Sequence, residues 1–511
     1  MRILLWHGWL LEGSGSNVYT SRVSAALVAA GHDVAILCQE RHPDRYPFVR
    51  AAGTVSANGV SSVVDLDRSA TGPAAGAVLL RPDIGRLLPV FVIDEYEGFE
   101  VKRFVDLTDG ELTAYLDRNV EALAAATDWF RPDIVVAGHA VPGPVVARRC
   151  LPDRGYVAKI HGSDLEYAIR LDRRYLALAR EGLEGAGAVI GPTSEVLDRL
   201  VRLVPAIAER TRVVSPGVDV DVFRPLPRAR ALEAVAERLE GDPEIAGGRP
   251  DELDQAVRAA IERRDGERLD ALAGGYDQEI PDRGAAAKLR ALARHTGPVV
   301  GYFGKLIPPK GVELLIQAFA LLRLVDARCL IVGFGTFREW LQAMVLALDA
   351  GDPGAARWLA ERSGTTLQLD GPQIEAAKGL ADRILFTGRL DHQYAPGALA
   401  ALDVLVVPSV LPEAFGMVAA EAAAAGALPL LARHSGLAEV SVALEEAAGC
   451  PGLFSFTPGP AAPRRIAQGV ERLFGLPAGE RLELRRRVSS FVAEEWTWER
   501  TAAQIIAAGV E

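Results

Sequence analysis

Short apolar runs alternate with helix-forming segments over most of the chain, and this alternation limits what the chain can fold into. The runs at 2–7, 34–38, 134–136, 299–303 and 329–332 are each followed by glycine or polar residues and then by a helical pattern. Strands that alternate with helices are typical of a parallel α/β sheet. In such sheets ligands bind at the carboxyl ends of the strands. We therefore expect the functional residues directly after these runs.

The length of 511 residues predicts more than one domain, because a single hydrophobic core does not grow to this size. We expect a first domain over 1–225 and a second over 297–498. The charged, amphipathic segments over 226–296 are interrupted by Gly and Pro and indicate a helical insertion or a mobile linker. The helical material over 340–380 exceeds one crossover connection and indicates a second insertion.

Composition disfavours several classes of protein. The net charge of -11 argues against a nucleic-acid partner. No run reaches the roughly 18 apolar residues of a membrane helix, so we expect no integral membrane segment. The apolar stretch at 3–7 is too short for a signal peptide, and we expect a cytoplasmic protein.

Residues 412–426 combine a helix N-terminus with two carboxylates. A helix-forming run begins near Met417, so free backbone N–H groups are expected at Phe415, Gly416 and Met417. That end suits a phosphate, whereas Glu413 and Glu421 suit hydroxyl groups. A nucleotide sugar has both kinds of group. The alternative is a helix-terminal charge and a solvated glutamate.

Two of the six lysines of the chain, Lys305 and Lys310, occur in one loop after the run at 299–303. The other 50 basic residues are arginines, which suggests that a compact point charge is needed here. The loop lacks the Gly-Lys-Ser/Thr of a Walker A motif. A cationic loop before a helix suits a diphosphate, and two solvated lysines are the alternative.

The first domain begins with a glycine-rich loop that resembles a dinucleotide fingerprint only in part. Gly13 and Gly15 are present, but Val18 stands at the third glycine position. Glu40 lies near the place of a ribose-binding acid, which leaves a dehydrogenase open. A turn without a ligand is the other interpretation.

Two further clusters follow strand-like runs of the first domain. His161 stands with Gly162, Ser163 and Asp164, which favours a functional histidine over a structural one. Residues 94–98 form an acidic, aromatic loop after a run at 90–93.

Together these residues resemble the retaining glycosyltransferases of family 4 (glycosyl transferases group 1). The matching motifs are Gly13-Ser14-Gly15, His161-Gly162, Ser215-Pro216-Gly217-Val218-Asp219, Gly304-Lys305, Lys310-Gly311, Gly333-Phe334-Gly335, Phe386-Thr387-Gly388-Arg389-Leu390, and Glu413 with Glu421. The resemblance covers nearly all of 1–225 and 297–511 and leaves out both insertions. It implies the α/β GT-B fold, in which two Rossmann-like domains face each other across a cleft. Lys305 departs from the family, which usually has Arg there.

The resemblance implies a hexosyltransferase of carbohydrate biosynthesis that needs no cofactor and no metal, with a nucleotide-diphosphate sugar as co-substrate. Lys305 and Lys310 would neutralise the leaving diphosphate, and Glu413 and His161 would contact the donor sugar. The donor-binding residues would be Gly15, Gly333, Gly335, Arg389, Leu390, Phe415, Gly416, Met417 and Glu421. The expected acceptor side is Asp94, Tyr96, Glu97 and Asp164, for a sugar, lipid or small-molecule acceptor. The helix at 499–511 would pack back on the first domain.

Two other functions fit the same fold. A sugar-nucleotide 2-epimerase would isomerise or hydrolyse the same donor without an acceptor. A nucleotide-sugar-binding protein without turnover would fit the change to Lys305 and the large insertions.

Overall fold

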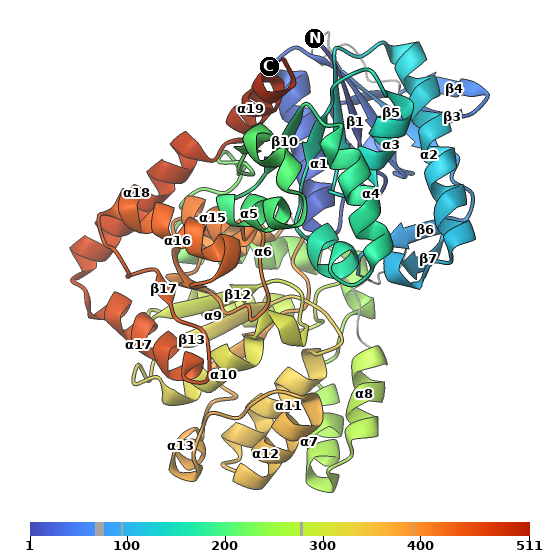
Figure 1. The fold of residues 1–511 in the computed structure, drawn as a ribbon. Helices are drawn as coiled ribbons and strands as arrows, with labels where there is room; N and C mark the ends of the chain where they lie inside the picture. The colour runs from blue at the N-terminus through green and yellow to red at the C-terminus, as the bar shows by residue number, and fades with distance from the viewer. Residues whose placement is uncertain (67–75, 93–95, 276–279, 392, 511) are drawn as a thin grey trace. The chain divides into compact units, whose positions relative to one another are not determined.

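The computed structural model describes residues 1–66, 76–92, 96–275, 280–391 and 393–510. The chain divides into two units, Met1–Gly217 with Trp496–Glu511, and Val218–Glu495. Both ends of the chain therefore belong to the first unit (Figure 1). Within the described residues, every helix is too short or too polar to cross a membrane.

The first unit contains a sheet with the strand order β11-β10-β9-β8-β1-β2-β5-β3-β4. Its strands are β1 (Arg2–Trp6), β2 (Asp33–Leu37), β3 (Val49–Ser56), β4 (Gly59–Asp65), β5 (Ala77–Pro82), β8 (Ile134–Gly138), β9 (Val157–Lys159), β10 (Ala188–Gly191) and β11 (Thr211–Val213). The strands are parallel except for the antiparallel pair of β3 and β4. The strand order reverses between β1 and β8, which makes this the switch point of the sheet.

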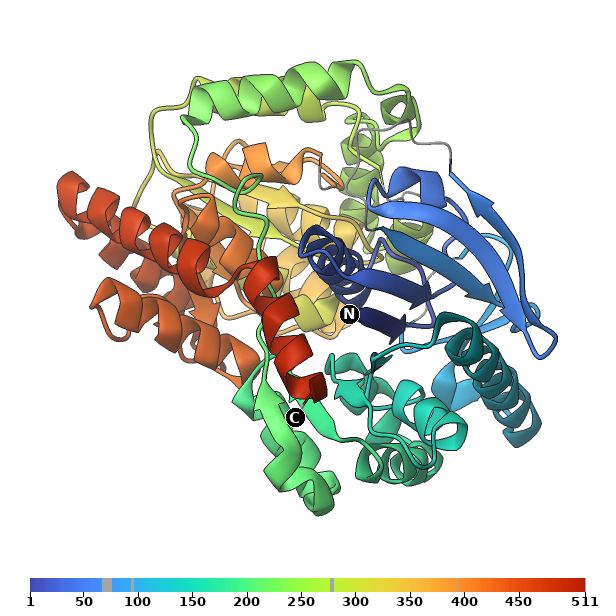
Figure 2. The ribbon, with the colours of Figure 1, turned by 90° about the horizontal axis from the view of Figure 1, so that it is seen from above.

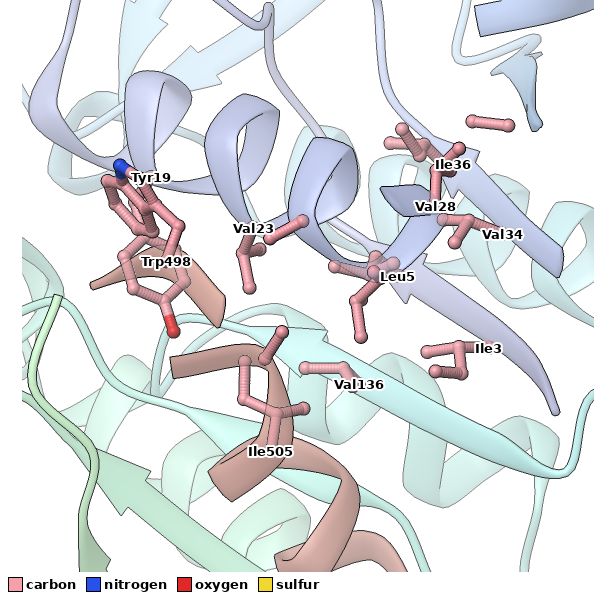
Figure 3. Close-up of a cluster of buried hydrophobic side chains, with 14 of the residues drawn as sticks. Ile3, Leu5, Tyr19, Val23, Val28, Val34, Ile36, Val136, Trp498 and Ile505 are labelled. Atoms are coloured by element: carbon pink, nitrogen blue, oxygen red, sulfur yellow. The ribbon is translucent and has the colours of Figure 1, made fainter. Parts of the chain in front are cut away.

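Helices cover both faces of this sheet, which explains why its central strands are apolar throughout. Ile3 and Leu5 of β1 pack against α1 (Gly15–Ala29) and the terminal helix α19 (Trp498–Val510), as Figure 3 shows. Trp6 points to the other face and donates a hydrogen bond to Asn119 of α2 (Asp109–Phe130) at 3.2 Å. The remaining helices of the unit are α3 (Gly143–Cys150), α4 (Arg173–Glu184) and α5 (Ser194–Leu203).

The long strands β3 and β4 form a hairpin at one edge of the sheet, drawn in blue in Figure 2. The sequence does not indicate this hairpin clearly, because the segment is rich in Gly, Ser and Ala. Most of β4 is exposed, so burial leaves no apolar pattern there. The strand expected at 90–93 lies earlier, as β6 (Leu87–Val90), which pairs in parallel with β7 (Glu100–Arg103) in a separate small sheet. Leu88 and Val90 of β6 are buried, so packing fixes this segment as a strand although it contains Pro89.

The second unit contains a parallel sheet with the order β14-β13-β12-β15-β16-β17. The strands are β12 (Val299–Phe303), β13 (Arg328–Val332), β14 (Ile384–Phe386), β15 (Val404–Val407), β16 (Leu428–Ala432) and β17 (Ser455–Phe456). The helices that follow them include α10 (Val312–Leu321), α14 (Ala395–Ala400), α15 (Met417–Ala424), α16 (Ser435–Ala448), α17 (Ala462–Gly475) and α18 (Ala478–Glu495). The strand order reverses between β12 and β15.

The described residues of 226–296 form helices that belong to the second unit. The helices are α6 (Arg228–Glu240), α7 (Leu253–Arg263), α8 (Gly266–Gly275) and α9 (Ala285–Ala293). Figure 1 shows α7 and α8 beside α11 (Arg338–Asp349) and α12 (Pro353–Ser363) of the second insertion. A buried, bidentate ion pair of Arg249 with Glu339, at 2.7 and 2.8 Å, ties the two insertions together.

Candidate active site

The switch point of the second unit brings together the loops that follow β12 and β15, where a ligand binds in sheets of this kind. The β12 loop carries Lys305 and Lys310, and the β15 loop carries Glu413. Backbone hydrogen bonds join the loops, since Val410 N–H donates to the carbonyl oxygen of Pro309 at 2.9 Å. Gly311 has a φ of +65°, and a Cβ there would lie 2.3 Å from the carbonyl oxygen of Pro408, so only glycine allows this approach.

Lys310 and Glu413 form an ion pair through the Nζ and Oε1 atoms. The Oγ of Ser409 donates to the same carboxylate oxygen at 2.6 Å. Burial raises the pKa of Glu413, but the charge of Lys310 and the hydrogen bonds from Lys310 and Ser409 outweigh it. The net pKa of Glu413 lies below its ordinary value, so the carboxylate is ionised at neutral pH.

Two residues that the sequence did not assign to the site, His434 and Ser435, hold the Glu413 loop in place. The backbone N–H of Glu413 donates to Oγ of Ser435 at 2.9 Å. His434 Nε2 lies 2.7 Å from the carbonyl oxygen of Ser409 and donates to it. Ser435 has a φ of +49°, an uncommon conformation for a residue with a side chain. Their position directly after β16 was the signal that could have identified them.

The loops after β12, β13 and β14 are joined by close backbone contacts. A Cβ on Gly333 would lie 1.9 Å from the carbonyl oxygen of Gly304, and one on Gly335 would lie 2.4 Å from that of Leu306. We expected these glycines to admit a ligand, and the structure shows that the chain itself makes the close approach. Gly333 N–H also donates to the carbonyl oxygen of Gly388 at 2.9 Å.

Two predicted cationic residues meet at one aromatic ring in these loops. Lys305 Nζ lies 5.4 Å from the ring centre of Phe334, and the guanidinium carbon of Arg389 lies 5.6 Å from it. Leu390, beside Arg389, is buried. The ring orients both cations at the carboxyl edge of the sheet, because a cation over an aromatic face is attracted to it.

Three helices begin at this edge, which gives it a positive potential. Helix α15 begins at Met417 after Gly416, whose φ is +87°, and Phe415 before it is buried. Helix α16 begins at Ser435, and a Cβ on Gly436 would lie 2.2 Å from the carbonyl oxygen of Ala414. Helix α10 begins directly after the lysine loop. Helix N-termini bind anions, and Glu421 lies about one turn into α15.

The switch point of the first unit carries a cluster of histidines at the ends of β1, β8 and β9. His7 and His139 are buried, and the ring centres of His139 and His161 lie 4.6 Å apart. His7 is held by Asn17 at 2.9 Å and Thr20 at 3.1 Å. Neither ring nitrogen of His139 has a hydrogen-bond partner among the described residues.

The histidines of this cluster are neutral. Burial, followed by the neighbouring His139, Lys159 and His7, holds the pKa of His161 well below its ordinary value. Burial lowers the pKa of His7 to about 4 despite its hydrogen bonds. Lys159 lies with its ammonium 4.5 Å from the ring centre of Tyr19, and burial lowers its pKa to about 7. A neutral His161 can exchange hydrogen bonds with sugar hydroxyls without adding charge.

Asp164, expected on the acceptor side, is instead fully buried and occupied by the backbone. Its carboxylate accepts from the N–H of Ala140, from Gly162 at 2.8 Å and from Leu165 at 3.1 Å. Burial still raises the pKa of Asp164 above its ordinary value. We therefore assign Asp164 to fixing the loops after β8 and β9.

The other predicted residues of the first unit lie in two loops. Gly15 begins α1, with open space where a Cβ would project. Tyr96 is half-buried and Glu97 exposed in the turn between β6 and β7. Asp94 lies outside the described residues. No group of three or more His, Cys, Asp or Glu among the described residues is arranged to hold a metal ion.

Comparison with known proteins identifies the family. Residues 14–217 match the model of the glycosyl transferase 4-like domain, and residues 358–474 match that of glycosyl transferases group 1. The 2-deoxystreptamine glucosyltransferase of Streptomyces kanamyceticus is 29% identical over 277 residues, which are 51% of this chain and 61% of that protein. The D-inositol 3-phosphate glycosyltransferase of Streptomyces coelicolor is 30% identical over 249 residues, 49% of this chain and 41% of that protein. The chain spans about half the length of the curated relatives it matches.

A solved structure shows the same fold along the whole chain. HepE of Anabaena, in complex with UDP, aligns with a TM-score of 0.59 and 15% identity over 99% of both chains. Its likeness to this chain shows the GT-B architecture of two α/β domains, each with a parallel sheet. The two matching models lie in the order in which the sequence motifs predict them. The chain therefore belongs to the glycosyl transferases of group 1, the family 4 glycosyltransferases with the GT-B fold.

Proposed function

We propose that the chain transfers a hexose from a nucleotide-diphosphate sugar to a hydroxyl acceptor, with retention of configuration and without a metal ion. The observation that carries the proposal is the edge of the second sheet. Lys305, Lys310 and three helix N-termini gather there at the switch point, and Glu413 and Glu421 stand beside them. Cations and helix ends suit the diphosphate, and carboxylates suit the sugar and ribose hydroxyls.

The residues of this edge would act mainly by stabilising charge. As the bond from the anomeric carbon to the diphosphate breaks, Lys305 and Lys310 would neutralise the negative charge that develops on the phosphate. In front-face substitution the donor phosphate takes the proton of the acceptor hydroxyl, so the protein supplies no nucleophile. Glu413 is held ionised by Lys310 and Ser409, which suits a carboxylate that accepts hydrogen bonds from the donor sugar.

The relatives favour a small set of donors to test first. The structure of Anabaena HepE has been solved with UDP-glucose, and a Streptomyces relative is named a glucosyltransferase. UDP-glucose should therefore lead a thermal-shift screen of UDP, GDP and ADP sugars. Glu421→Ala should abolish the stabilisation by the best donor if this carboxylate holds the ribose.

Product analysis separates transfer from the alternatives. With an acceptor panel, transfer gives a new glycoside and the free nucleoside diphosphate, whereas an epimerase gives an altered or hydrolysed donor without acceptor. EDTA should leave the rate unchanged. A rate that EDTA abolishes and Mg²⁺ or Mn²⁺ restores would contradict the metal-free part of the proposal. Donor binding with no turnover across the panel would favour a binding protein.

A further inference from the structure

A polar cavity of about 510 Å³ lies in the first unit, outside the histidine cluster. It spans the carboxyl ends of β2, β5 and β3 and the antiparallel partner strand β4. Arg41 and Arg81 line it together with Thr54, Ser61 and Phe99. Its position follows the general rule for parallel sheets, in which ligands bind where strands end.

The strand register places three polar side chains of the cavity on one face of the sheet. Thr54 of β3 is the partner of Arg81 of β5 and also of Ser61 of β4. Paired residues of neighbouring strands point to the same face. The hydroxyl oxygens of Thr54 and Ser61 lie 3.1 Å apart. The cavity therefore presents a guanidinium beside two hydroxyl groups, a donor set suited to an oxyanion.

Arg81 is half-buried and forms no ion pair or hydrogen bond through its side chain with any described residue. A half-buried guanidinium that forms no ion pair with the described residues is available to an anion, which would compensate for the hydration lost on partial burial. Arg41 lies 5.0 Å from the ring centre of Phe99 and makes one long hydrogen bond, of 3.5 Å, to the carbonyl oxygen of Gly98. The cavity also contains Asp83, whose carboxylate accepts from Gly85 N–H at 3.2 Å. Two guanidinium groups against one carboxylate leave a net positive charge.

The cavity lies far from the histidine cluster along the same sheet edge. Four strand spacings separate β5 from β9, in the order β9-β8-β1-β2-β5. At about 4.8 Å per spacing, Arg81 is roughly 19 Å from the strand that precedes His161. A ligand group bound by Arg81 would therefore lie well away from a sugar hydroxyl at His161.

We propose that this cavity binds an anionic group, a phosphate or a carboxylate, of an extended acceptor. The inference names the acceptor class and rests on the proposed function. Arginine is suited to this task, because its planar fork binds phosphate and carboxylate through two parallel hydrogen bonds. Phe99, which lines the cavity, directly follows the loop at 94–98 that the sequence assigned to the acceptor, and Gly98 of that loop accepts a hydrogen bond from Arg41.

Binding of three small probes to the full chain tests the proposal by calorimetry, with excess UDP present to occupy the lysine loop. Glucose 6-phosphate and glucuronate carry the two anions, and glucose is the neutral reference. We expect at least one of the two anions to bind ten times more tightly than glucose, and the tighter one identifies the anion of the acceptor. Equal binding of all three probes would overturn the proposal.

Variants of residues inside and outside the cavity test whether the anion binds there. Arg81→Gln should remove most of the tenfold preference, and Thr54→Val should reduce it without removing charge. Arg86→Gln changes an exposed arginine that does not line the cavity and should keep the preference. His161→Ala should also keep it, because the anion is bound remotely. The proposal fails if Arg81→Gln binds like wild type while remaining folded, or if His161→Ala weakens the anion as much as Arg81→Gln does.

The nucleotide-sugar screen separates this inference from the proposed function. If the chain binds no nucleotide sugar but still binds an anionic probe more tightly than glucose, the proposed function is refuted, whereas the anion site at Arg81 stands. A chain that binds and turns over its donor without any anion preference would refute only the acceptor class. With a turned-over anionic acceptor, Arg81→Gln should raise KM tenfold or more and leave donor hydrolysis unchanged.

Discussion

The ammonium group of Lys310 donates to Oε1 of Glu413, so the ion pair joins the loops that follow β12 and β15. The two residues are 103 positions apart in the chain. The pair places a cation and a carboxylate at the switch point, where a diphosphate and a sugar would lie side by side. It also keeps Glu413 ionised, which favours hydrogen bonding to hydroxyl groups over nucleophilic attack.

Replacing Lys310 tests the electrostatic role of the lysine loop. Lys310→Ala should lower kcat by about 10²–10³, or roughly 3–4 kcal/mol, as the loss of a preorganised charge at a leaving group does. The control, Lys378→Ala, removes an exposed lysine and should leave the rate unchanged. A Lys310→Ala rate within about threefold of wild type, or roughly 0.7 kcal/mol, would rule the role out.

The histidine cluster predicts acid sensitivity of the first unit. His7 has a pKa of about 4 in the fold and near 6.5 when unfolded, so the unfolded chain takes up protons first as the pH falls. The fold should lose about 2 kcal/mol from His7 between pH 7 and pH 5. Urea unfolding of wild type and His7→Gln at both pH values measures this. An equal pH dependence of the two proteins would contradict the account.

Glu313, at the start of α10, predicts the opposite pH dependence for the second unit. The residue is 6% exposed, its Oε2 has no hydrogen-bond partner among the described residues, and burial raises its pKa to about 7. The neutral carboxyl group of Glu313 favours the folded state below pH 4.5. This contribution to the unfolding free energy is lost as the pH rises to 7, because the carboxylate is more stable in the unfolded chain. Glu313→Gln should therefore raise the unfolding free energy at pH 8 by up to about 3 kcal/mol, with a much smaller change at pH 4. A variant less stable than wild type at pH 8 would show that the carboxylate is satisfied.

Gly333 tests the joined loops after β12 and β13. Gly333→Ala would bring a Cβ to 1.9 Å from the carbonyl oxygen of Gly304, so the loops must separate. We expect the variant to lose about 2 kcal/mol or more of stability and to bind donor weakly. Gly371→Ala is the matched control, because nothing lies within 4 Å of a Cβ there. Donor affinity is measured by titration and stability by thermal melting for both variants. Unchanged donor affinity in Gly333→Ala would show that these loops are not part of the donor site.

The sequence predicted the fold where burial leaves a clear pattern. Strands such as β12 and β16 are buried along their length and appear as continuous apolar runs. The hairpin of β3 and β4 could not be recognised in this way, because β4 is largely exposed and β3 contains Gly53. Its place depends on pairing with β5, which is a tertiary contact.

The candidate site was predictable as a set of residues but not as an arrangement. Lys310 and Glu413 were both named from local patterns, whereas their ion pair depends on two loops meeting at the switch point. His434 and Ser435 support Glu413 through hydrogen bonds that no local pattern indicates. Asp164 resembled an exposed polar residue after a strand, and only the fold shows its carboxylate held by backbone N–H groups.

The most direct test of the central claim is the anomeric configuration of the product. The best α-linked nucleotide sugar from the donor screen is incubated with an accepted alcohol, and the anomeric configuration of the glycoside is read by proton NMR. We predict an α-linked glycoside and one equivalent of free nucleoside diphosphate, both formed about 10²–10³ times more slowly by Lys310→Ala. A β-linked product would contradict retention, and donor conversion without any glycoside would contradict transfer.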